Sequence, residues 1–169
     1  MATQGCPCGF LGDERRRCRC SPRMILRYRA KVSGPLLDRI DLHIEVPPVT
    51  SPELLDSTDG EGSVAVAARV EAARRLQLAR FAGRDGLYAN GQMGARDVQR
   101  YCRAEDTGLS LLRSAMARFG LSARTFHRVL KIARTIADLA ESETIRTAHL
   151  AEAIQYRGLD RSVPGSTCS

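Results

Sequence analysis

Hydrophobic and polar residues follow two different patterns along this chain of 169 residues. From about residue 64 onward, apolar side chains recur every three or four positions, which is typical of amphipathic helices. Between residues 41 and 46 polar and apolar residues alternate instead (DLHIEV), which predicts a single strand that is half buried or at a sheet edge. Pro47 and Pro48 end this strand. The pattern therefore favours a mostly α fold.

The helical part divides at residues that start or stop helices. Gly120 is expected to end one helix, while Ser122 and Thr147 are expected to cap the N-termini of the next two. Apolar stripes on three of the helices mark the expected buried faces (Val66, Val70, Ala73; Leu109, Leu112, Met116, Phe119; Phe126, Val129, Leu130, Ala133, Ala137, Ala140). We expect helices over residues 64–81, 96–102, 106–119, 122–140 and 147–156.

The N-terminal region is organised differently. Residues 1–22 carry glycines and prolines without periodicity and predict a loop, and residues 23–31 favour a short basic helix that Ser33-Gly34-Pro35 breaks. A single strand cannot form a sheet, so this region is typical of the end of an α/β domain whose beginning is missing. The expected division is 1–48 as that remnant, 49–63 as a linker, 64–161 as an all-α domain and 162–169 as a disordered tail.

Charge is concentrated near the N-terminus. The chain has a net charge of +7, and residues 1–31 hold eight basic and two acidic side chains, which is +6 of that total. A localised basic segment attracts phosphate-bearing partners, so Arg15, Arg16, Arg17 and Arg19 are candidate nucleic-acid contacts. The alternative is a solvated loop in a protein in which 24 of 26 basic residues are arginine.

The composition excludes some classes of protein. No apolar run approaches the roughly 18 residues that span a membrane, and the N-terminus lacks the features of a signal peptide, so a cytoplasmic location without a membrane partner is expected. No G-x-x-x-x-G-K-[ST] motif is present, so we expect this chain alone not to hydrolyse nucleotides. For His43, His127 and His149, which are far apart and lie within predicted elements, a structural role is favoured over a catalytic one.

Four of the six cysteines lie within fifteen residues, in the stretch CPCGFLGDERRRCRC. Cys6, Cys8, Cys18 and Cys20 form two C-x-C pairs that are able to bind one zinc ion tetrahedrally, and the neighbouring arginines are expected to lower the thiol pKa values. Free thiols and disulfides are the alternatives, and a reducing compartment argues against disulfides.

Four blocks of the sequence resemble the C-terminal half of the magnesium-chelatase-like AAA+ ATPases of the ComM/YifB competence family. The blocks are CPCGFLGDERRRCRCSP, YRAKVSGPLLDRIDLHIEVP, LSARTFHRVLKIARTIADL and HLAEAIQYRGLDR, and the resemblance extends over about residues 2–161. It implies that the chain corresponds to the end of an AAA+ core followed by its helical lid. It also implies a homo-hexamer with ATP and Mg²⁺ as cofactors in the full-length protein, and motor activity on DNA of the branch-migration type.

The resemblance assigns roles to particular positions. Arg39 of LLDRID resembles the arginine finger that reaches the nucleotide of a neighbouring subunit, although pairing with Asp38 or Asp41 is the alternative. Arg124 of LSART matches the sensing arginine of the lid best, with Arg128 one turn further along the helix. The family usually has Asn-Pro before Cys-Pro-Cys, where the Asn polarises the attacking water; Gln4-Gly5 stands there in this chain, which puts that role of Gln4 in doubt.

Two other functions remain open at this point. One is a zinc-stabilised, arginine-rich DNA-binding module without ATPase activity, and the other is a chelatase-type subunit that remodels another protein. The resemblance through the whole lid argues against the first, and the cysteine cluster argues against the second.

Overall fold

The computed structural model describes residues 2–13, 15–37, 39–47 and 60–157. These residues are mostly helical, as predicted, and the chain divides into two compact units. The first unit consists of Met1–Ile40 and Glu45–Asp56, and the second of Asp41–Ile44 and Ser57–Ser169. Residues 49–59 of the expected linker and the whole of the expected tail lie outside the described residues.

The first unit contains the short basic helix that the sequence predicts. Helix α1 covers Pro22–Arg29, and the side chain of Ser21 caps it by accepting a hydrogen bond from the amide of Met24 at 3.3 Å. A second short helix, α2, covers Gly34–Leu37 and was not predicted. No side chain of α1 is buried, so this helix is not held by a hydrophobic core of its own.

The predicted strand over residues 41–46 is wrong. Residues 42–47 carry no regular secondary structure, and the amide of His43 donates a hydrogen bond to the carbonyl of Tyr156 at 2.8 Å. The alternation of polar and apolar residues predicts an extended backbone, but a strand also requires a neighbouring strand. The part of the chain that the structure describes contains one isolated β-bridge, between Ala104 and Ile145, and no ladder.

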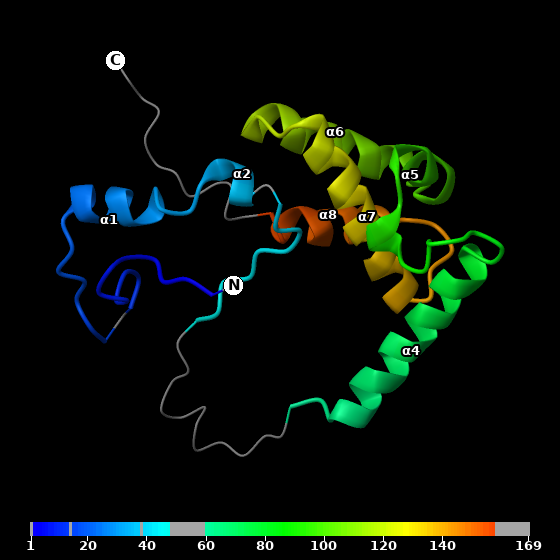
Figure 1. Ribbon diagram of the computed structural model, residues 1–169, viewed down its shortest axis with the longest axis horizontal. Coiled ribbons are helices and arrows are strands. Elements are labelled where there is room, and N and C mark those ends of the chain that lie inside the picture. Colours follow the sequence, from blue (N-terminus) through cyan, green and yellow to red (C-terminus); the bar gives the residue numbers. More distant parts are fainter. Residues whose placement is uncertain (1, 14, 38, 48–59, 158–169) are drawn as a thin grey trace. The chain divides into compact units, whose positions relative to one another are not determined.

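The second unit is a helical domain whose centre is one amphipathic helix (Figure 1). Helix α7 packs against α4, α5, the 3₁₀ helix η1 and α8, while α6 packs against α8. The largest fully buried apolar side chains of this core are Leu112, Ile145, Leu150, Val98 and Val129. The helices are α4 (Ser63–Arg80), η1 (Asn90–Gln92), α5 (Ala95–Tyr101), α6 (Asp106–Phe119), α7 (Ala123–Leu139) and α8 (Thr147–Gln155). The five helices expected here are therefore present.

The buried face predicted for α4 is only partly right. Ala73 is buried, but Val70 is 46% exposed, and Gln77 is buried instead of a further apolar residue. The reason is that α4 contributes polar contacts at its C-terminal end, where Gln77 accepts a hydrogen bond from Arg74 and Arg80 reaches Asp138. On α7 the predicted stripe is buried except at its ends, since Phe126 is half-buried and Ala140 is exposed.

Helix α8 begins differently from the prediction. Arg146, not Thr147, is the N-cap residue, and its amide donates to Nδ1 of His149 at 3.2 Å. The amide and hydroxyl of Thr147 both donate to Oε2 of Glu105 at 3.0 Å. A side chain distant in sequence thus satisfies the free amide of the first turn, a role usually taken by a local cap.

Gly108 lies where α6 approaches α8 closely. A Cβ atom at this position would be 2.7 Å from Cδ1 of Leu150 and 3.3 Å from the backbone Cα of Thr147. Alanine is the better helix former by about 1 kcal/mol, but overpacking costs about 1–3 kcal/mol, and a backbone atom cannot rotate away. We expect Gly108→Ala to lower the free energy of unfolding by about 1 kcal/mol, measured by urea denaturation of the chain.

Ser110→Ala provides a matched control for this substitution. Ser110 is exposed on the same helix, so the added helix propensity acts there without a packing cost and stability should be unchanged or slightly higher. Equal stability of Gly108→Ala and Ser110→Ala would show that α6 and α8 move apart without a cost in free energy. Their close approach would then not restrict the residue type at position 108.

Candidate functional site

The four clustered cysteines of the first unit come together in space. The Sγ atoms of Cys6, Cys8, Cys18 and Cys20 all lie within 4.8 Å of one another. Cys6 lies 3.4 Å from Cys8 and 3.7 Å from Cys18, and Cys8 lies 3.6 Å from Cys18, measured between Sγ atoms. All four are free thiols, and no disulfide joins any two of them in this structure.

Two tight turns bring the cysteine pairs together. The amide of Gly9 donates to the carbonyl of Cys6 at 3.1 Å, and that of Asp13 donates to the carbonyl of Phe10 at 3.3 Å. Gly9 and Gly12 adopt positive φ angles of 81° and 83°, a conformation that residues with a Cβ atom rarely adopt. The sequence CGFLG therefore reverses the chain directly after the first cysteine pair.

The thiol pKa values diverge within the cluster. The backbone amide of Phe10 is the main cause that lowers the pKa of Cys8 to about 6, whereas desolvation raises the pKa of Cys20 to about 12. The amide of Cys20 lowers the pKa of Cys18, but desolvation and the neighbouring thiols outweigh it and the net direction is upward. The prediction that arginines lower these pKa values is therefore wrong for Cys18 and Cys20, because desolvation and the neighbouring cysteine side chains raise the pKa of both thiols.

The candidate nucleic-acid contacts lie in the part of the chain between Cys8 and Cys20. Oδ1 of Asp13 accepts hydrogen bonds from the amides of Arg15 and Arg16, at 2.7 and 3.0 Å, and so forms a local turn. The guanidinium of Arg16 lies over the ring of Phe10, 5.2 Å from its centroid. The four predicted arginines are all exposed (Arg15, Arg16, Arg17, Arg19). The segment between the two cysteine pairs thus presents its arginine side chains outward from an ordered turn.

Gln4 and Arg29 lie beside the same loop. The amide group of the Gln4 side chain is next to Gly9, and Gln4 is exposed. Nε of Arg29 donates to the carbonyl of Gly5 at 3.2 Å, which joins α1 to the cysteine-rich loop. Gln4 is therefore accessible to a ligand, while Arg29 has a structural contact.

Arg39 follows α2 in a turn. Its amide donates to the carbonyl of Leu36 at 3.0 Å, and its side chain is exposed. Of the two acidic partners considered for it, Asp38 lies outside the described residues. Asp41 forms an ion pair with Nε of Arg128 at 3.3 Å. The side chain of Arg39 is therefore accessible to solvent.

Arg124 and Arg128 belong to the second unit, on α7. Arg124 lies in the first turn of this helix and is exposed, whereas the side chain of Arg128 is only 19% exposed. Nη1 of Arg128 is buried without a hydrogen-bond partner among the described residues. The two arginines predicted for nucleotide binding therefore differ, since one is free for a ligand and the other is engaged with Asp41.

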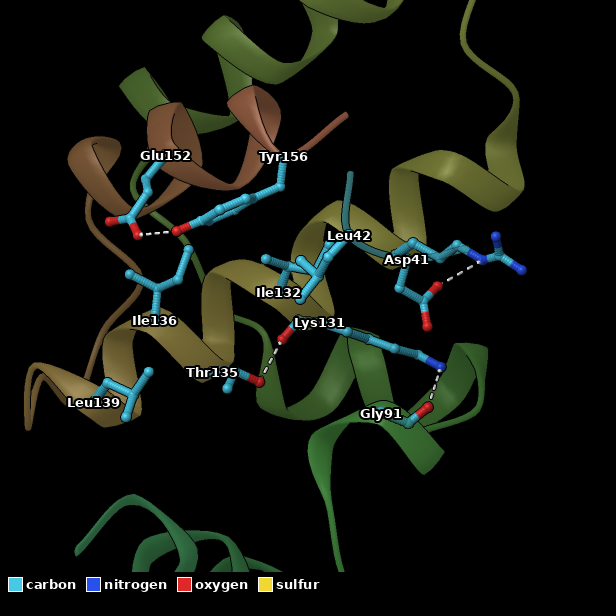
Figure 2. A pocket seen from close by; sticks show the side chains of 11 residues that line it. Asp41, Leu42, Gly91, Lys131, Ile132, Thr135, Ile136, Leu139, Glu152 and Tyr156 are labelled. Carbon is cyan, nitrogen blue, oxygen red and sulfur yellow. Dashed lines mark hydrogen bonds and ion pairs between the residues drawn. The ribbon is translucent and has the colours of Figure 1, made fainter. Parts of the chain in front are cut away.

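A pocket of about 410 Å³ lies next to Arg128 (Figure 2). Figure 2 shows Ile132, Ile136 and Leu139 along one wall, with Lys131 donating to the carbonyl of Gly91 at 3.0 Å. The hydroxyl of Tyr156 donates to Oε1 of Glu152 at 3.2 Å, and this contact raises the pKa of Tyr156. The pocket was not predicted, because it joins Asp41 and Leu42 to helices far along the chain and periodicity within one segment carries no signal of such contacts.

The structure also reveals a buried ionic cluster that sequence reasoning missed. Asp138 has no exposed side-chain surface and accepts hydrogen bonds from Arg80 at 2.7 Å, from Arg134 at 3.0 Å and from Asn90 at 2.7 Å. Nη1 of Arg134 also donates to the carbonyl of Glu143 at 2.7 Å. The spacing of Arg134 and Asp138, four residues apart on one helix, was the available signal. This cluster holds α4, η1 and the C-terminal end of α7 together.

The three histidines lie in different surroundings, and both ring nitrogens of His43 are buried without a hydrogen-bond partner among the described residues. His149 accepts the hydrogen bond at the start of α8, His127 packs against the ring of Phe126 at 5.8 Å, and His43 is 7% exposed. Among the described residues no catalytic pair that includes a histidine is apparent in these contacts.

Comparison with known families covers both units. Residues 60–157 match the family described as magnesium chelatase, subunit ChlI C-terminal, and residues 1–54 match magnesium chelatase, subunit ChlI. The second unit is thus similar to the C-terminal domain of that family. Among the described residues no helix has both the length and the apolar character required to cross a membrane.

Individual relatives are longer than this chain. Competence protein ComM of Haemophilus influenzae is 42% identical over 85% of the chain, and YifB of Escherichia coli is 40% identical over 85%. Rv2897c of Mycobacterium tuberculosis is 31% identical over 93% of the chain. The aligned regions make up 27%, 28% and 30% of these relatives, so the chain spans less than a third of their length.

Proposed function

This chain belongs to the magnesium chelatase family, with ComM and YifB among its relatives, and on that premise we propose that it is part of an AAA+ ATPase that acts on DNA. The name of the Haemophilus relative links that protein to competence. In this proposal the chain supplies a DNA-contacting loop, an arginine for the active site of a neighbouring subunit, and the helical lid. The proposed location is the cytoplasm.

The observation that supports DNA contact is the ordered basic turn. Arg15, Arg16, Arg17 and Arg19 are exposed, and Asp13 fixes the backbone of this turn through two amide hydrogen bonds. Planar guanidinium groups donate two parallel hydrogen bonds to a phosphate, and a pre-ordered backbone lowers the entropy lost on binding. This turn is therefore suited to the phosphate backbone of DNA and does not by itself specify a base sequence.

The nucleotide-related roles rest on ring formation. We assign Arg39 as the arginine finger that acts on the nucleotide of the next subunit in a homo-hexamer, with ATP and Mg²⁺ bound by the core of the full-length protein. Arg124 is the preferred sensing residue of the lid, because its side chain is exposed, whereas Arg128 would have to leave Asp41. Gln4 would orient water only if its amide reaches the same nucleotide.

The proposed domain division follows from these roles. Residues 1–48 form the end of the ATPase core, 49–63 a linker and 64–161 the lid. A DNA-binding module without ATPase activity is the second candidate, and the exposed arginine turn favours it equally. In the described part of the chain, no arrangement of side chains gives comparable support to chelatase-type protein remodelling.

DNA binding by the arginine turn is directly testable. We expect the chain to bind duplex DNA with an affinity that falls steeply with salt, by a slope of about −0.9 for each phosphate contacted in a plot of log K against log salt concentration. Replacing Arg15, Arg16, Arg17 and Arg19 with glutamine should weaken binding and make this slope shallower by about 3–4. Fluorescence anisotropy over a salt series measures both quantities.

A second quadruple variant controls for net charge. Arg75, Arg96, Arg103 and Arg113 are exposed residues of the second unit, and replacing them with glutamine removes the same charge elsewhere. This variant should keep most of the salt slope. Equal losses in the two variants would show that DNA responds to overall charge, and unchanged binding in the first variant would remove the turn from the DNA contact.

A further inference from the structure

The spacing of the cysteine sulfurs is that of a tetrahedral metal site. A zinc ion bound by four thiolates at about 2.3 Å places neighbouring sulfurs about 3.8 Å apart. The separations of 3.4, 3.6 and 3.7 Å between the Sγ atoms of Cys6, Cys8 and Cys18 are close to this value. A disulfide requires a separation of about 2.05 Å instead, so these sulfurs are arranged around a common centre and are not paired.

The loop that carries these cysteines has little else to stabilise it. In the described part of residues 2–40, Cys6 is the one fully buried apolar side chain, while Leu11, Met24 and Leu26 are exposed. Small segments without a hydrophobic core require disulfides or a metal ion to fold. The burial of a sulfur in place of an aliphatic side chain indicates that the sulfurs are the centre of this loop.

We propose that Cys6, Cys8, Cys18 and Cys20 bind one Zn²⁺ ion that holds the loop between them in its folded form. Binding replaces the four thiol protons with four Zn–S bonds and leaves a net charge of −2 on the ZnS₄ group. The exposed arginines that follow in the loop offset this charge. All four coordination positions are filled by protein, which makes the site structural, without an open position for a substrate.

Two arguments favour zinc over metals that prefer oxygen ligands and over clusters of several iron ions. An all-sulfur tetrahedral site selects zinc or iron–sulfur chemistry over magnesium, calcium or manganese, which prefer oxygen ligands. The four sulfurs lie within 4.8 Å of one another, which leaves room for one ion but not for a cluster containing several iron and sulfide ions. This inference goes beyond the proposed ATPase and DNA functions and does not depend on either of them.

Metal content and cobalt substitution test the site in the complete chain. Protein purified without chelator should contain about one zinc per chain by elemental analysis. After removal of zinc under reducing conditions, added Co²⁺ should give the intense visible d–d bands of tetrahedral cobalt together with sulfur-to-cobalt charge transfer, and zinc should displace it. A metal-free protein with reactive thiols at all four positions, and no such bands with cobalt, would overturn the proposal.

Variants distinguish the proposed ligands from other cysteines. Cys18→Ser should lose stoichiometric zinc, whereas Cys168→Ser should retain it, because Cys168 is not one of the four. Cys20→His should still bind cobalt, with bands shifted as expected for three sulfurs and one nitrogen, which shows retained folding at a changed ligand. Full zinc content in Cys18→Ser, or an unshifted cobalt spectrum in Cys20→His, would exclude those residues as ligands. Metal content and DNA affinity are measured separately. A failure to bind DNA would therefore contradict the proposed DNA function without contradicting the metal site.

Discussion

Replacing Arg39 with alanine in a full-length protein that carries this sequence is expected to lower ATP turnover by about a thousandfold or more. An arginine finger stabilises negative charge that develops in the transition state, so its loss affects turnover far more than ATP affinity. The side chain of Arg39 is exposed on a short turn after α2, which is compatible with contact across a subunit boundary. Steady-state ATPase assays and nucleotide-binding measurements check both parts of this expectation.

Two further variants separate a finger from a structural charge. Arg39→Lys should recover little activity, because an ammonium group cannot reproduce the planar fork of the guanidinium. Arg23→Ala removes an exposed arginine from α1 of the same unit and should leave turnover close to that of the unmodified protein. If lysine restores most of the activity, Arg39 contributes only a local positive charge.

Mixed rings test whether Arg39 acts on a neighbour. Subunits with Arg39→Ala should be combined with subunits that lack the phosphate-binding lysine of the core, each inactive alone. A mixed ring contains some boundaries with an intact finger and an intact phosphate loop, so partial recovery of ATPase activity is expected. Absence of recovery in rings shown to be mixed would assign Arg39 to a structural contact within its own subunit.

The helices of the second unit were predictable because their signals are local. Leu112 on α6 and Val129 on α7 each belong to an apolar stripe with helical spacing. Gly120 adopts the left-handed conformation that ends α6, and Ser122 caps α7 through the amide of Thr125. The clustering of Cys6 with Cys18 was likewise predictable, since few residues separate the pairs. Interactions within one or two turns of chain leave a pattern in the sequence.

The features that were missed depend on contacts between distant segments. Asp41 pairs with Arg128, and Glu105 satisfies the amide of Thr147, although nothing in the local pattern of either segment indicates its partner. The incorrect strand at residues 41–46 has the same origin, because alternation reports the backbone conformation and not the neighbour that a strand requires. The sequence therefore predicts elements and candidate residues better than it predicts which polar groups meet.

The buried carboxylate of Asp138 leads to the largest expected effect on stability. Asp138→Ala should lower the free energy of unfolding by about 3–5 kcal/mol, because it leaves the guanidinium groups of Arg80 and Arg134 close together without their common partner. Arg134 is 3% exposed, so water cannot replace the lost carboxylate. Urea denaturation followed by circular dichroism measures this change in the complete chain.

Two further variants, Asp138→Asn and Arg69→Ala, test whether the loss of stability comes from the buried charge. Asn keeps the size of the side chain and one acceptor oxygen but removes the charge, so it should recover only part of the loss. Arg69 pairs with Glu61 on the surface, with about half of each side chain exposed, and its replacement should change the free energy of unfolding little, because water solvates Glu61 when its partner is removed. If Asp138→Ala lowers the free energy of unfolding no more than Arg69→Ala does, the buried cluster adds no more to stability than a solvated ion pair. Packing around α7 alone would then hold α4 and η1 in place.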